Sequence, residues 1–114
     1  MKKYILIILC TISLVGLYQC KNSKNASSSA ENRLLVAAQK RWPDATSKSL
    51  SDGHNIYMTK CTQCHGAKEI EDYTEERWNS ILDNMARKAK LTDVEKETVK
   101  QYIIATLDLS KAKK

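Results

Sequence analysis

Turn-forming residues are scarce in this chain, and this scarcity constrains its fold more than any other feature. Of 114 residues only one is Pro and three are Gly, and the glycines stand alone at positions 16, 53 and 66. A β-sandwich or barrel needs a turn every few residues, and nucleotide-binding loops need clustered glycines. The sequence therefore argues against these architectures and favours an all-α fold.

The first 19 residues have the pattern of an export signal. Two lysines precede an apolar run over residues 4–18, which is shorter than the ~20 residues of a membrane span but suits a signal peptide. The run leads into Cys20 with Leu17 three residues before it, which resembles the lipobox of bacterial lipoproteins, although Gln19 replaces the usual small residue. We expect residues 1–19 to be removed and Cys20 to be lipidated. An ordinary free cysteine and a disulfide partner are the alternatives.

The remaining chain divides by composition into a tether and one small domain. Residues 20–33 are rich in Ser and Asn and have no hydrophobic period, which is typical of a flexible linker. Residues 34–114 are left for the fold, with a core at 49–108. A domain of this size commonly needs a disulfide, a metal or a cofactor to complete its core.

The charge balance is mildly basic, with a formal net charge of +6. Such a charge favours solubility and docking with acidic proteins. No nucleic-acid recognition motif accompanies it, so nucleic acid is not an expected partner.

The segment Cys61-Thr62-Gln63-Cys64-His65 carries the chemistry of the sequence. The C-x-x-C-H pattern is that of c-type haem attachment, in which each cysteine forms a thioether with one vinyl group and the histidine binds the iron. A thioredoxin-like pair would follow a strand, which this segment lacks. A zinc site would need four ligands in a tetrahedron, and a disulfide would strain so short a loop. We therefore expect one covalently bound haem c, held by Cys61, Cys64 and His65.

Helical periodicity surrounds this motif. Leu50, Gly53 and Tyr57 form one stripe that leads to Cys61. A second amphipathic helix follows Thr74 as N-cap, and a third begins with the capping box Thr92-Asp93-Val94-Glu95. An earlier helix is expected over Leu34–Arg41, ended by Pro43. The apolar positions of the second and third helices are Trp78, Ile81, Leu82, Met85, Ala86 and Ala89, and Val94, Val99, Tyr102, Ile103 and Leu107.

With these features in place, residues 49–108 resemble a small monohaem c-type cytochrome domain. The resemblance implies three to four helices wrapped around the haem, with Gly53 and Tyr57 crossing the C-terminal helix. Many cytochromes c also have a Gly-Pro after the haem motif, whose backbone carbonyl accepts from the proximal histidine. Here Gly66 is followed by Ala67 and no Pro occurs, so this carbonyl is expected elsewhere in the loop, near Ile70.

The sixth iron ligand is predicted to be Met85. Trp78, Ile81, Met85, Leu91, Thr92 and Glu95 match the W-x-x-I-x-x-x-M and L-T-x-x-E helices of several small cytochromes c. The distal methionine of that pattern falls on Met85, while Met58 lies on the helix leading to the proximal side. His54 and an open sixth position are the alternatives, and a methionine that only fills the core remains one as well.

These features predict an electron carrier rather than an enzyme. The expected protein cycles its haem between Fe(III) and Fe(II), binds no small-molecule substrate and has no catalytic residues. It faces the periplasm, anchored to a membrane through Cys20, and exchanges electrons with redox proteins. The alternative is a haem enzyme or gas sensor with an open sixth position. Electron delivery to one exported dehydrogenase or reductase is a narrower form of the carrier function.

Overall fold

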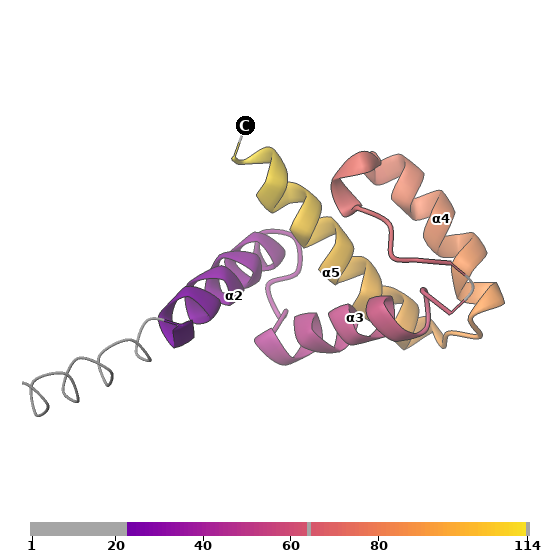
Figure 1. Ribbon diagram of the computed structural model, residues 1–114, viewed down its shortest axis with the longest axis horizontal. Coiled ribbons are helices and arrows are strands. Elements are labelled where there is room, and N and C mark those ends of the chain that lie inside the picture. Colours follow the sequence, from indigo (N-terminus) through magenta and orange to yellow (C-terminus); the bar gives the residue numbers. More distant parts are fainter. Residues whose placement is uncertain (1–22, 64, 114) are drawn as a thin grey trace, which may run out of the picture. The chain divides into compact units, whose positions relative to one another are not determined.

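All the regular secondary structure of the described residues is helical (Figure 1). The structure is a computed structural model that describes residues 23–63 and 65–113. The chain divides into two units after Ala30, and the core described below belongs to the second unit. The elements of the described residues are α2 (Ser23–Gln39), which begins in the first unit, α3 (Ser47–Thr59), the 3₁₀ helix η1 (Ile70–Asp72), α4 (Glu75–Lys88) and α5 (Asp93–Lys111). The all-α prediction is confirmed for these residues.

Helix α2 differs from the expectation. It begins at Ser23, although residues 23–33 were expected to form a flexible linker, and it ends at Gln39 instead of continuing to Arg41. Ala30, Glu31 and Arg33 are good helix formers, and no Gly or Pro interrupts the segment. The signal, Cys20 and the start of the tether lie outside the described residues. No helix among the described residues is long and apolar enough to cross a membrane.

Threonines begin the three helices that follow. The hydroxyl of Thr74 accepts from the amide of Arg77 at 3.3 Å, and Thr92 forms the expected capping box with Glu95. A further box, which the sequence analysis missed, joins Thr46 and Ser49 at the start of α3. In this box a serine takes the place of the usual Glu or Gln.

Helices α3 and α5 cross at Gly53, as the resemblance implied. A Cβ atom on Gly53 would lie 2.5 Å from the Thr98 carbonyl oxygen and 2.8 Å from Tyr102 Cβ. Real Cβ atoms essentially never approach other atoms so closely, so only glycine lets the two backbones meet at this point. The rings of Tyr57 and Tyr102 pack beside the crossing, with centroids 6.2 Å apart.

Replacing Gly53 with alanine is therefore expected to lower the free energy of unfolding by about 1–3 kcal/mol, because the added methyl forces α3 away from α5. Chemical denaturation measures this change. Ser51→Ala, at an exposed position of the same helix, is the control and should change stability by less than about 0.5 kcal/mol. An unchanged midpoint for Gly53→Ala would contradict the close crossing.

The core lies where α3, α4 and α5 meet. Val99, Ile103 and Ile104 of α5 are fully buried, and they pack with Trp78 and Leu82 of α4. Val94 was expected on this buried side but is 76% exposed. It occupies the first turn of α5, so the buried face of this helix begins one turn later than predicted.

Arg41 ties together three distant parts of the chain. Its guanidinium donates to both carboxylate oxygens of Glu75, at 2.8 and 2.9 Å, and to those of Asp108, at 2.7 and 3.2 Å. The hydrogen bond to Glu75, followed by that to Asp108, raises the pKa of Arg41. The group links the turn after α2 to the first residue of α4 and the last turns of α5.

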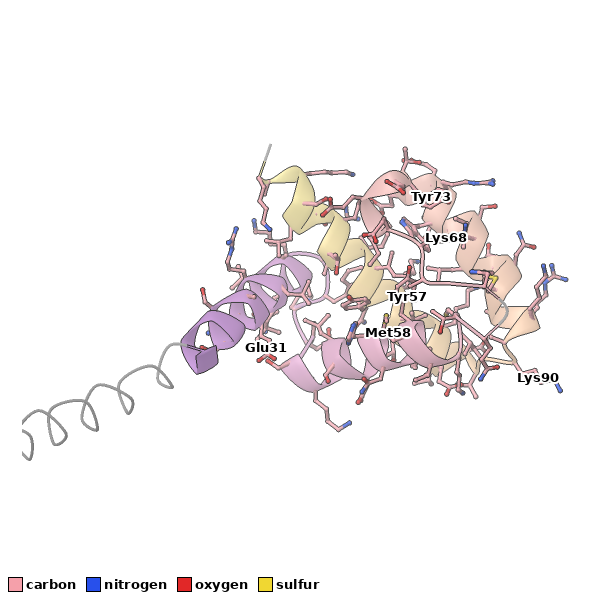
Figure 2. The ribbon with its side chains drawn as sticks, viewed as in Figure 1. Glu31, Tyr57, Met58, Lys68, Tyr73 and Lys90 are labelled. Carbon is pink, nitrogen blue, oxygen red and sulfur yellow. The ribbon has the colours of Figure 1, made fainter. Side chains whose placement is uncertain are left out.

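The turn between α4 and α5 holds Lys90 in a left-handed conformation, with φ of 52°. The amide of Leu91 donates to the Ala86 carbonyl at 2.9 Å and that of Lys90 to the Arg87 carbonyl at 3.4 Å. These two bonds form a Schellman motif, in which the position of Lys90 usually belongs to glycine. Lys90 lies at the end of α4 in Figure 2.

We expect Lys90→Gly to raise the free energy of unfolding by about 0.5–1 kcal/mol, because glycine adopts this φ without strain. Thermal or chemical denaturation measures the gain. Lys90→Ala removes the same charge but keeps the strain, so it should not stabilise the protein. Equal stabilisation by both variants would assign the effect to charge instead of backbone conformation.

Candidate functional site

Cys61 and His65 follow directly on α3. Cys61 lies in the turn after the helix, and its amide donates to the Ile56 carbonyl at 3.3 Å. Its side chain is only 7% exposed, and this burial raises the pKa of the thiol. Cys64 lies outside the described residues. Lys60 pairs with Glu95 of α5 at 2.5 Å, which fixes the end of α3 just before the motif.

A cavity brings the two described motif residues together with the predicted distal ligand. Cys61 and His65 border it on one side, and Met85 of α4 borders it as well. The other lining residues come from α3, the loop after His65, α4 and α5: Tyr57, Thr62, Gly66, Ala67, Lys68, Trp78, Ile81, Leu82 and Ile103. One largely apolar cavity is therefore lined by both Cys61 and Met85, which are 24 positions apart in the sequence.

The other candidates for a sixth ligand lie elsewhere. His54 is exposed and outside the cavity lining; its ring packs on Tyr102 with centroids 5.1 Å apart. Met58 is 47% exposed and is also absent from the lining. Met85 is half-buried, on the same face of α4 as the buried Trp78.

The donor atoms around the cavity suit a covalently attached haem. A thiol at Cys61 matches thioether formation, and imidazole and thioether groups, which His65 and Met85 carry, are ligands that haem iron takes in cytochromes c. The cavity volume open to the centre of a water-sized sphere is only about 20 Å³, far less than a haem occupies. A haem would enter only if the residues that line the cavity, Met85 of α4 among them, moved apart.

The loop after His65 differs from the expectation in one respect. The carbonyl for the proximal histidine was expected from this loop, near Ile70, but the Ile70 carbonyl oxygen accepts from Trp78 Nε1 at 2.9 Å. His65 Nδ1 instead lies 2.9 Å from the carbonyl oxygen of Gly66. This contact favours the tautomer with the proton on Nδ1, which leaves Nε2 free to bind a metal.

Exposed basic residues lie close to the cavity. Lys68 borders it directly, with its ammonium group 5.6 Å from the centroid of the Tyr73 ring. Arg87 and Lys88 occupy the last turn of α4, next to Met85, and Lys90 follows them. All four side chains are exposed.

No family model matches this chain, and neither the curated proteins nor the solved structures compared with it contain a match.

Proposed function

We propose that this chain is an exported electron carrier of the monohaem c-type cytochrome kind, tethered to a membrane through Cys20. The observation that carries the proposal is the cavity that Cys61, His65 and Met85 border together. The sequence motif alone predicts attachment of a haem. The cavity adds a methionine thioether from a separate helix beside the attachment site, which is the second ligand of the His/Met pair in cytochromes c.

Each residue has a distinct role in this proposal. Cys61 and Cys64 would hold the haem covalently, and His65, through Nε2, and Met85 would ligate its iron. When bound, the haem supplies one-electron chemistry by alternating between Fe(III) and Fe(II). The apolar side chains around it, Trp78 and Leu82 among them, keep water from the iron. With His65 and Met85 both taken as iron ligands, the chain would bind no substrate at the iron and would act as a carrier instead of an enzyme.

The partners in this proposal are acidic redox proteins. Lys68 borders the cavity, and Arg87, Lys88 and Lys90 follow Met85 at the end of α4; such positive charge increases the rate at which an oppositely charged protein docks. The effect is screened by salt. The tether raises the local concentration of the carrier near membrane-bound partners.

The optical spectrum of the oxidised protein, purified from a host that matures c-type cytochromes, tests the proposal. A low-spin spectrum with the weak far-red band of methionine-ligated ferric haem c is the expected result. The reduced protein should bind carbon monoxide slowly or not at all, because Met85 occupies the sixth position. A high-spin ferric spectrum with rapid carbon monoxide binding would instead support an enzyme or gas sensor.

Lipid anchoring has its own test, the variant Cys20→Ser. We expect this protein to leave the membrane fraction after export, because a lipid-modified cysteine is the proposed anchor. Cell fractionation, followed by metabolic labelling with a fatty acid, measures the change. Its haem content should equal that of the unchanged protein. Membrane association that survives both the substitution and a salt wash would contradict the lipid anchor.

A further inference from the structure

Two aromatic side chains hold the loop that follows His65. The hydroxyl of Tyr57, on α3, donates to the backbone carbonyl of Lys68, and Trp78 Nε1, on α4, donates to that of Ile70 at 2.9 Å. Figure 2 labels both partners of the first bond, Tyr57 on α3 and Lys68 in the loop. The two helices on either side of the loop thus each supply one hydrogen bond to its backbone.

The two donors belong to one packed aromatic group. Tyr57 and Trp78 are 7% and 2% exposed, and their rings pack edge to face with centroids 6.1 Å apart. Tyr73 packs on Trp78 from the other direction, with centroids 5.5 Å apart. Because both donors are buried and line the cavity beside His65, their positions are set by the core and not by the loop.

The loop itself has little else to order it. Residues 66–69 form no regular secondary structure, and their side chains are exposed. The only Pro of the chain is Pro43, so no proline ring restricts the backbone here. Ordering each residue of a loop costs about 1–2 kcal/mol in conformational entropy, which the two hydrogen bonds partly offset.

We propose that Tyr57 and Trp78 are positioning residues for His65. By fixing the carbonyls of Lys68 and Ile70, they hold the loop so that the Gly66 carbonyl faces His65 Nδ1 and Nε2 points to the iron site. The assignment rests on the proposed function for the role of His65 as a ligand. In this chain, two side-chain hydrogen bonds order the segment that a proline restricts in many cytochromes c.

The hydroxyl of Tyr57 keeps its proton over a wide pH range, because burial, the largest influence, raises its pKa. The bond to the Lys68 carbonyl therefore persists at the pH values at which a redox protein works.

Nuclear magnetic resonance of the reduced protein, as purified, tests this role. Two signals matter: solvent exchange of the Trp78 indole proton, which reports on the loop, and the His65 Nδ1 proton, which reports on the ligand. Tyr57→Phe keeps the ring and removes only the hydroxyl. We expect indole exchange to rise about two- to tenfold, as the loss of one ordinary hydrogen bond allows, and the His65 signal to shift or broaden.

Tyr73→Phe is the matched control, because it also removes a hydroxyl from a ring packed on Trp78. It should leave both signals unchanged, and denaturation of both variants shows whether global stability accounts for any difference. The proposal is overturned if the two variants behave alike, if Tyr57→Phe leaves the His65 signal in place, or if the Trp78 proton of the unchanged protein exchanges as fast as free indole.

The absorbance spectrum of the same samples separates this proposal from the proposed function. Suppose that the purified protein contains no haem, but that its Trp78 indole proton is protected from exchange and loses this protection in Tyr57→Phe. This result would refute the proposed electron carrier, while the two hydrogen bonds would still be shown to order the loop. Protein with haem whose His65 signal ignores Tyr57→Phe would refute the positioning role and leave the carrier intact.

Discussion

Replacing both Cys61 and Cys64 with alanine is expected to abolish covalent haem attachment completely. Thioether bonds to these two sulfur atoms are the only covalent links that the motif offers, and iron ligation by His65 does not survive denaturation. Haem staining after denaturing electrophoresis measures the loss, which should be total in the double variant. Each single variant should retain one bond and stain more weakly.

Cys20→Ser is the matched control for this experiment, since it changes a third cysteine that has no proposed role in haem binding. Its staining should equal that of the unchanged protein after export. Haem that remains bound to the double variant under denaturing conditions would contradict the assignment of the motif.

Met85→Ala is expected to lower the reduction potential by about 0.1–0.3 V, a fraction of the ~0.8 V over which axial ligands tune haem. A methionine thioether stabilises the reduced iron, and its loss leaves an open or water-filled position. The far-red band should disappear, and the reduced protein should bind carbon monoxide rapidly. Redox titration followed in the visible spectrum measures both effects.

Met58→Ala provides the control for Met85, because Met58 is 47% exposed and does not line the cavity. Its potential and spectrum should remain those of the unchanged protein. If Met85→Ala changed neither property, Met85 would be a core residue and the ligand would have to be sought elsewhere.

Features that depend on neighbouring residues could be predicted from the sequence. The buried positions of α3 are Leu50, Gly53 and Tyr57, as its helical stripe indicated. The N-cap at Thr74 and the capping box of Thr92 with Glu95 are present as expected. In these cases a spacing of three or four residues fixes both the helix geometry and the contact.

Features that depend on distant residues or unusual backbone could not be predicted. The partners of Arg41 lie 34 and 67 residues away, and no local pattern marks them. The positive φ of Lys90 could not be predicted, because glycine is the usual residue at such positions and a lysine does not indicate one. The carbonyl beside His65 belongs to the expected loop but to Gly66 and not to a residue near Ile70; the Ile70 carbonyl accepts from Trp78, a contact that depends on how α4 packs against η1.

The candidate site lies between these two cases. The motif from Cys61 to His65 is local and indicates its chemistry directly. Met85 was proposed from a resemblance in α4 and α5, and the structure places it on the cavity that Cys61 and His65 border. That juxtaposition required the packing of α4 against α5, which no spacing in the sequence determines.

The mass of the intact protein, purified under denaturing conditions from a host that matures c-type cytochromes, tests the central claim most directly. The predicted mass is that of the processed chain plus one haem, with an alkaline pyridine spectrum typical of haem bound through two thioethers. A chain at its bare polypeptide mass, with both motif cysteines free to react with a thiol reagent, would contradict the account.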